Sequence, residues 1–192
     1  MHVSTICSTC FYWLRQIRRI RRSINTDYAA TLVHARVDYC NTVLAGSPKT
    51  ITDRIQRVLN AAARVVSSAR KFDRGLSKLL QSELHWLDIP QRVQYKLGVI
   101  VHQCLQNKTP QYLVDCCKRT SDVSSRQRLQ SANHNQLIVP RHRRSMFGRR
   151  AFSVVGPMEW NSLPDSLRDP ARSNDSFRSA LKTHLFAALQ DD

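Results

Sequence analysis

Acidic residues are scarce in this chain of 192 residues, where 14 Asp and Glu stand against 30 Lys and Arg and leave a formal net charge of +16. Solubility alone does not require this excess, and strongly basic domains usually bind a polyanion, most often nucleic acid. The excess is concentrated in an N-terminal arginine cluster and in a segment from Lys118 to Arg150 whose only acidic residue is Asp122. The composition therefore predicts a polyanionic partner.

Glycine is also rare, and the signatures of catalysis are missing. The five glycines are too scattered for a phosphate-binding loop or a dinucleotide fingerprint, and no serine lies in a Gly-x-Ser-x-Gly elbow. The only adjacent carboxylates are Asp191 and Asp192 at the end of the chain. Two-metal nucleotidyl transfer needs carboxylates held within a few ångströms of each other. We therefore predict no catalytic residue, no metal site and no cofactor.

No apolar run approaches the roughly 20 residues that cross a bilayer. The apolar stretch from Ile6 to Leu14 precedes its arginines, which reverses the order found in a secretory signal. We therefore expect an intracellular protein, nuclear or cytoplasmic, that is neither secreted nor membrane-spanning. Binding of a basic amphipathic helix to an anionic membrane surface stays open as a disfavoured alternative.

The chain has six cysteines, and without a secretion signal they are best interpreted as reduced thiols. Cys7 and Cys10 have Cys-x-x-Cys spacing, which is also the i,i+3 spacing of a helix face. No second pair follows at the distance of a zinc ribbon. We therefore expect both thiols on a helix face or in a core, with zinc binding as the weaker alternative.

Most of the chain has the periodicity of helices. The clearest example runs from Thr50 to Ser67, where Ile51, Ile55, Val58, Leu59, Ala62, Val65 and Val66 fall on one stripe. Further helices are expected at 4–24, 27–44 and 76–84, from Pro90 to Leu105, and from Pro110 to Cys117. A last helix begins near Ser173 and buries Phe177, Leu181, Leu185 and Leu189.

The predicted fold class is mainly α, a bundle of about five to six helices with a C-terminal helix. Residues 136–140 and 150–155 have strand-like composition, so a small β-hairpin is one interpretation of this region. Residues 118–136 are polar and lack a period. We predict a helical domain over 1–117, a basic polar linker over 118–136 and a C-terminal tail over 137–192.

Several blocks of sequence together resemble a known family. They are HARVDYCNTVLAG (34–46), IQRVLNAAARVV (55–66), LHWLDIPQRVQYKL (84–97), VPRHRRSMFGRRAFSVVGPMEWNSLPDSLR (139–168) and SFRSALKTHLF (176–186). In order and approximate spacing they resemble the C-terminal part of the reverse transcriptases of LINE-type, jockey-like non-LTR retrotransposons. The resemblance covers nearly the whole chain, from about Thr5 to Phe186.

The resemblance implies the thumb and post-thumb region of an RNA-directed DNA polymerase. In that family an endonuclease and the polymerase fingers and palm precede this region, and the palm carries a Tyr-x-Asp-Asp motif that binds catalytic magnesium ions. This chain has no such motif, because VDYC at 37–40 lies in the block that follows the palm. The family often has proline after LHWL, where this chain has Asp88; that departure bears on a turn. The resemblance thus implies a thumb-like helical fragment that is not an enzyme.

The positions that match the family are mostly structural. Trp86 and Trp160 are expected to anchor packing. Asp38, Tyr39 and Asn41 are expected to make polar contacts between helices, with nucleic-acid contact as the weaker alternative. The nucleic-acid-binding candidates are arginines, because guanidinium groups bind phosphate oxygens bidentately. They are Arg15, Arg18, Arg19, Arg21, Arg22, Arg141, Arg143, Arg144, Arg149 and Arg150. The expected partner is RNA, DNA or an RNA–DNA hybrid, contacted at phosphates rather than bases.

Two other functions stay open at this point. The apolar stripes of helices that would face the absent palm suit a protein-interaction module, which would bind that palm or self-associate. The chain is also consistent with a non-functional remnant of a decayed retroelement.

Overall fold

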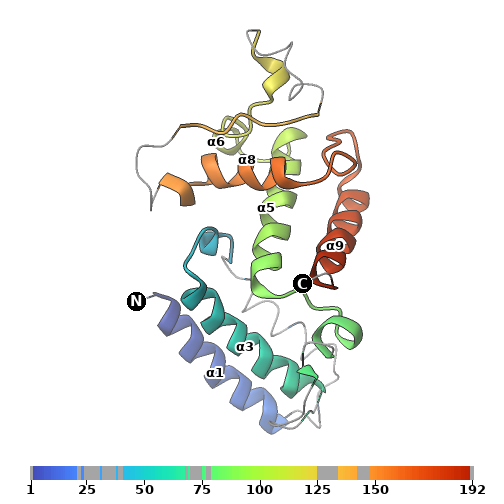
Figure 1. Cartoon of the computed structure of the whole chain (residues 1–192). Coiled ribbons are helices and arrows are strands. Elements are labelled where there is room, and N and C mark those ends of the chain that lie inside the picture. Colours follow the sequence, from blue (N-terminus) through green and yellow to red (C-terminus); the bar gives the residue numbers. More distant parts are fainter. Residues whose placement is uncertain are drawn as a thin grey trace. The chain divides into compact units, whose positions relative to one another are not determined.

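We describe a computed structural model of the chain (Figure 1). It describes residues 2–20, 23, 31, 38, 41–67, 69, 75–76, 79–124, 134–141 and 148–190. The described part is mainly helical, which confirms the predicted fold class. Its contacts divide the chain into two compact units, Met1–Arg92 and Val93–Asp192. The divisions predicted from the sequence, after residues 117 and 136, stay predictions.

The first unit contains α1 (His2–Ile20), the 3-10 turn η2 (Asn41–Leu44), α3 (Lys49–Ser67), the π-helical turn η3 (Leu79–Glu83) and the start of α5 (Ile89–Leu105). Helices α1 and α3 run side by side in the same direction (Figure 1). The predicted period of α3 is confirmed, because its buried residues include Ile55, Val58, Leu59, Ala62 and Val66.

Two predicted helices of this unit differ from the structure where it is described. Residues 41–44, the end of the helix expected at 27–44, form a 3-10 turn rather than α-helix. Gly46 follows with a φ of 62°, a conformation that glycine adopts without strain, and Pro48 cannot continue a helix. Within the segment expected at 76–84, residues 79–83 form a π-helical turn. The rest of the 27–44 prediction lies outside the described residues, apart from Thr31 and Asp38.

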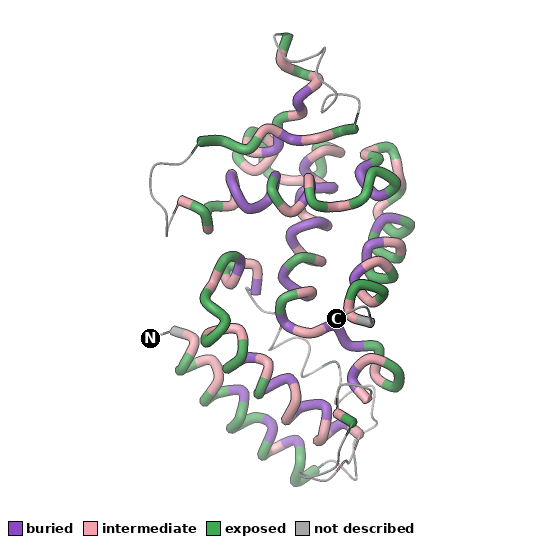
Figure 2. Tube along the Cα trace, in the orientation of Figure 1, coloured by how far each residue is buried: buried purple, intermediate pink, exposed green. Residues whose placement is uncertain are grey.

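The core of the first unit lies between α1 and α3. Cys10, Leu14 and Ile17 of α1 pack against the stripe of α3, together with Leu80, Trp86 and Ile89. Figure 2 shows buried positions recurring along both helices, with exposed positions between them. One side of α1 is therefore buried against α3, and its opposite side remains in solvent.

The second unit contains the rest of α5, then α6 (Gln111–Val114), the 3-10 turns η4 (Thr120–Asp122) and η5 (Gly148–Arg150), α8 (Phe152–Ser162) and α9 (Asn174–Gln190). Two glycines allow close helix packing. A Cβ on Gly98 of α5 would lie 2.9 Å from Leu181 Cδ2 of α9, and one on Gly156 of α8 would lie 3.2 Å from Val101 Cγ2 of α5. Both α8 and α9 therefore pack closely on α5.

The β-hairpin interpretation is wrong, because residues 152–155 begin α8. The other predicted strand makes an isolated bridge instead, between Leu137 and Arg119. Asn161 of α8 binds both backbone groups of Leu137: the Leu137 N–H donates to Asn161 Oδ1, and Asn161 Nδ2 donates to the Leu137 carbonyl, each at 2.8 Å. The side-chain amide of Asn161 thus pairs with the backbone groups of Leu137 that a second strand would otherwise bind. The burial of Val154 and Val155 within the helix overrides their β-propensity.

Candidate nucleic-acid interface

The solvent side of α1 carries three of the predicted arginines. Arg15, Arg18 and Arg19 are exposed, and α1 contains no acidic residue. The structure gives these three side chains no ion pair among the residues it describes. Arg18 and Arg19 lie in the last turn of the helix, where the partial negative charge of the backbone stabilises cations. Arg21 and Arg22 lie outside the described residues.

The orientation of these arginines follows from the apolar pattern of α1. Cys10, Leu14 and Ile17 recur at i, i+4 and i+7 and are buried against α3, so positions such as 15 and 19 must face away from it. Arg54 of α3 adds a further exposed cation near the N-terminal half of α1, because its Nη1 donates to Ser4 Oγ at 3.1 Å. The packing that stabilises α1 therefore also presents its cations to solvent.

The two cysteines of α1 lie on its inner side, which confirms that they are helix-face or core thiols. Cys10 is buried and Cys7 is half-buried against the core. Burial raises the pKa of the Cys7 thiol, and the positive charge of Arg54 partly offsets that rise. Within the described part, no three His, Cys, Asp or Glu side chains are grouped so that they could hold a metal ion.

Three exposed aromatic residues precede the arginines, and the sequence interpretation missed them. Phe11 is 38% exposed, Tyr12 56% and Trp13 43%. The Tyr12 and Trp13 rings meet edge to face, with centroids 5.8 Å apart. A helical projection finds Phe11 and Tyr12, because they lie four and three residues before Arg15 and hence on the same side of α1. The stretch from Ile6 to Leu14 is mostly apolar, so its sequence alone does not indicate that these aromatic side chains are exposed.

The second predicted cluster is only partly described. Arg141 and Arg149 are exposed, and Arg150 is half-buried; Arg143 and Arg144 lie outside the described residues. Arg149 and Arg150 end the η5 turn directly before α8. Trp160 of α8 is fully buried, and its indole Nε1 donates to the Asn135 carbonyl at 2.9 Å. The predicted structural role of Trp160 agrees with this burial, and the grouping of Arg141 with Arg149 and Arg150 stays a prediction.

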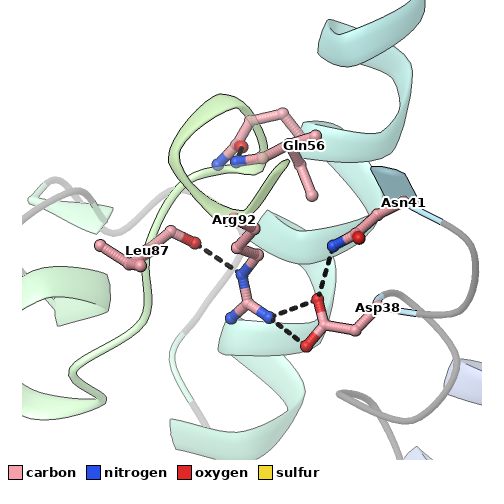
Figure 3. A network of polar contacts seen from close by, with 6 residues as sticks. Asp38, Asn41, Gln56, Leu87 and Arg92 are labelled. Atoms are coloured by element: carbon pink, nitrogen blue, oxygen red, sulfur yellow. Dashed lines mark hydrogen bonds and ion pairs between the residues drawn. The ribbon is translucent and has the colours of Figure 1, made fainter. Parts of the chain in front are cut away.

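A polar network connects Asp38 to the start of α5 (Figure 3). Nη1 of Arg92 lies 2.9 and 3.0 Å from the two Asp38 carboxylate oxygens. Its Nε donates to the Leu87 carbonyl at 2.7 Å, and Asn41 Nδ2 donates to Asp38 Oδ1 at 3.3 Å. Arg92 also lies over the Trp86 ring, 5.8 Å from its centroid. The predicted contact between helices is therefore a contact between a bend at Asp38 and α5, and the hydrogen bond of Asn41 is to Asp38. Tyr39 lies outside the described residues, and Trp86 is buried.

Gln56 fixes the start of α5 from α3. The Ile89 N–H donates to Gln56 Oε1 at 2.9 Å, and Gln56 Nε2 donates to Asp88 Oδ1 at 2.7 Å. One amide therefore satisfies a free N–H group at the start of the helix and orients the carboxylate beside it. The side chain of Asp88, where the family that the sequence blocks resemble often has proline, takes part in this contact.

Comparisons of the chain with protein-family models, with curated proteins and with solved structures find no match. None of the helices in the described ranges is long and apolar enough to cross a membrane. The residues themselves therefore carry the functional argument.

Proposed function

We propose that the chain binds the sugar–phosphate backbone of nucleic acid, with the exposed arginines of α1 as its main contacts. The observation that carries this proposal is the cluster of Arg15, Arg18 and Arg19 on the solvent side of a helix without acidic residues. Cations without nearby carboxylates repel one another unless a negative partner is present. A phosphate backbone supplies closely spaced negative charges in a line, which suits cations repeated along a helix.

Arg141, Arg149 and Arg150 are proposed to add affinity. Phosphate contacts position a protein on its ligand without specifying sequence, so we expect little preference among base sequences. The formal net charge of +16 contributes attraction at long range, and it accelerates association at low salt.

We further propose that the chain is the thumb and post-thumb fragment of a LINE-type retrotransposon reverse transcriptase without its palm. The resemblance of the sequence blocks is the basis of this proposal. The burial of Trp86 and Trp160, which match family positions, supports a structural role for those blocks. The chain lacks the Tyr-x-Asp-Asp motif, so we expect it not to extend a primer.

Fluorescence anisotropy with a labelled oligonucleotide tests the binding proposal. If about six phosphates are neutralised, the affinity should fall roughly a thousandfold between 50 and 200 mM salt. Replacing Arg15, Arg18 and Arg19 together with Gln should reduce the slope of log K against log salt by about three, one for each phosphate that is no longer neutralised.

Arg178→Gln is the matched control, because Arg178 is exposed in α9 and lies 3.9 Å from Asp175 Oδ1. It should leave the salt slope unchanged. A second variant, in which Arg141, Arg149 and Arg150 become Gln, measures the contribution of the other cluster. An affinity that does not respond to salt would contradict the proposal, and an unchanged slope in either variant would remove the corresponding arginines from the interface.

Two simple tests address the proposed origin. Primer extension with purified protein, a templated primer and magnesium should give no product; extended product would contradict the assignment as a fragment without a palm. The reading frame upstream of Met1 in the gene provides the second test. An in-frame Tyr-x-Asp-Asp palm there would support a retroelement origin.

A protein-interaction module is the second candidate function. Val43 and Tyr112 are 66% and 70% exposed, so apolar and aromatic surface is available to a partner. Light scattering at increasing concentration distinguishes this candidate. Self-association without any affinity for oligonucleotides would favour it over nucleic-acid binding.

A further inference from the structure

We infer that the solvent side of α1 is a stacking platform for single-stranded nucleic acid. This inference rests on the proposed function and specifies its ligand. It starts from the stripe formed by Phe11, Tyr12, Arg15, Arg18 and Arg19, all of which are exposed. We call this set the α1 stripe.

The α1 stripe alternates rings and cations at helical spacing. Phe11, Arg15 and Arg18 follow one another at i, i+4 and i+7, and Tyr12 and Arg19 flank Arg15 at three and four residues. Side chains with these spacings are neighbours on one side of a helix. The stripe covers about 12 Å along α1, from a rise of 1.5 Å per residue. Each ring therefore has a guanidinium group beside it.

The exposure of these rings contrasts with the burial of the aromatic rings in the cores of the two units. Trp86, Trp160 and Phe177 are 5%, 0% and 0% exposed, so this chain buries aromatic rings where a core is available. The Trp13 and Tyr12 rings meet edge to face, and Trp13 therefore restricts the space that the Tyr12 ring can sample. A ring that is already held in place loses less entropy when a ligand packs on it.

Charge and ring chemistry together select the ligand. Bases stack on exposed aromatic side chains, while arginines bind the phosphates between those bases. In a duplex the base faces are stacked on one another and unavailable, so rings on a protein surface gain little from it. A single strand offers both its base faces and its phosphates. The lack of any acidic residue in α1 fits this polyanion, whereas an acidic protein surface would leave the rings without a specific partner.

The test compares a single-stranded RNA oligonucleotide with a duplex of the same length, using fluorescence anisotropy and tryptophan emission. The main variant carries Phe11→Leu and Tyr12→Leu, which keep apolar side chains but remove the aromatic faces. Because both residues are exposed, the far-ultraviolet circular dichroism should not change. The matched control is Tyr112→Leu in α6, where the tyrosine is 70% exposed.

Stacking of a base on an aromatic side chain corresponds to about a 5- to 150-fold change in affinity. We therefore expect the double variant to bind the single strand at least about fivefold more weakly and the duplex within about twofold of the unmodified chain. The control should change neither affinity. The single strand should also quench tryptophan emission more than the duplex does, because Trp13 is 43% exposed while Trp86 and Trp160 are buried. Trp13→Leu should abolish that quenching.

The outcomes separate this inference from the proposed function. If both oligonucleotides bind and the double variant binds the single strand as well as the unmodified chain does, the stacking platform is wrong and nucleic-acid binding stands. If neither oligonucleotide binds at low salt, the proposed function fails and the inference fails with it. Two further results would overturn the inference: Trp13 quenching by vesicles of anionic phospholipid but not by RNA, and self-association that the double variant abolishes without any loss of RNA binding.

Discussion

Both compact units bury a tryptophan and an arginine, but the buried arginine has different hydrogen-bond and ion-pair partners in each. In the first unit Arg92 is held by the Asp38 carboxylate, the Leu87 carbonyl and the face of Trp86. In the second unit Arg168 pairs with Asp165, and its Nε and Nη1 atoms have no hydrogen bond in the described structure. Burial lowers the pKa of Arg168. The second unit instead centres on a stack of neutral rings, His102 and Phe177, with centroids 4.2 Å apart.

The two units therefore hold their helices in place by different interactions: a buried ion pair in the first and aromatic packing in the second. A buried ion pair costs desolvation of both charges, so it stabilises only when its hydrogen bonds are complete. Aromatic packing carries no such cost and gains from area and ring geometry. The first unit should therefore be sensitive to the loss of a charge partner, and the second to the loss of volume and to the protonation of His102.

Trp160→Ala should produce the largest effect on the second unit. Trp160 is fully buried, so the change leaves a cavity and an unpaired Asn135 carbonyl, at a cost of about 3–5 kcal/mol in the free energy of unfolding. Urea denaturation followed by hydrogen exchange measures this loss. Protection in α8 and α9 should fall, while protection in α1 and α3 is retained. Trp13→Ala, at an exposed position, should cost under about 1 kcal/mol, and an equal loss in both variants would contradict the assigned core.

Arg92→Met should destabilise the first unit by about 2–3 kcal/mol, because it leaves the half-buried Asp38 carboxylate without its cation. This range is below the usual cost of breaking a buried pair, since the Asp38 side chain is 28% exposed and partly screened by water. Arg92→Lys keeps the charge but loses the guanidinium geometry, so its stability should fall between those of the other two proteins. Thermal unfolding of the three proteins at one pH measures the series. If the Met variant were as stable as the unmodified chain, the network would have no net stabilising role.

Asn161→Ala should cost about 1–2 kcal/mol, because it leaves the N–H and carbonyl groups of the buried Leu137 without their amide partner. Asn161→Asp is the informative comparison, since a carboxylate still accepts from the Leu137 N–H but cannot donate to its carbonyl. Hydrogen exchange at the Leu137 amide reports the first contact directly. Unchanged protection in the alanine variant would rule out the contact.

His102 should make the second unit less stable as the pH falls. Burial lowers the pKa of His102, and hydrogen bonds to Asn174 and to the Arg172 backbone partly oppose that shift; Lys108 lowers it and Asp169 raises it. The pKa of His102 in the unfolded chain is near 6.5. Below that pH the unfolded chain binds a proton at His102 and the folded chain does not, so stability falls until the pH reaches the pKa of the folded state. The slope is at most about 1.4 kcal/mol per pH unit.

The His102→Phe variant isolates this effect, because it should lose the slope between pH 7 and 5. The difference between the two proteins is the measured quantity, since burial also raises the pKa of Glu159 and that group acts in the opposite direction at lower pH. Parallel pH profiles for the two proteins would exclude the role of His102.

Sequence reasoning predicted the elements whose period is long and regular. The stripe of α3 and the buried positions Phe177, Leu181 and Leu185 of α9 were found because burial imposes the helical repeat directly. The strand-like composition of residues 150–155 gave a wrong prediction. The packing of α8 on α5 at Gly156 outweighs the preference of Val154 and Val155 for β-strands. The partners of Arg92 and Asn161 lie 54 and 24 positions away, and a single sequence carries no signal for such pairs.

The candidate site was found in part for the same reason. Arginine clusters are visible in the sequence, so Arg15, Arg18 and Arg19 can be identified as candidates without the structure. The exposure of Phe11 and Tyr12 cannot be predicted in this way, because an apolar run within a helix usually belongs to the buried core. Only the packing of α1 on α3 shows which side of that run remains in solvent.

The two hydrogen bonds from the Asn161 side chain to the Leu137 backbone affect which backbone groups are open to pairing with other molecules. An extended segment with one unsatisfied edge is a template onto which another molecule can add its own backbone, and repeated addition leads to fibres. Here one side of residues 136–138 hydrogen-bonds to Lys118 and Thr120, and Asn161 occupies backbone groups of Leu137 that would otherwise be open. The backbone groups of Leu137 are therefore not open to pairing with another molecule.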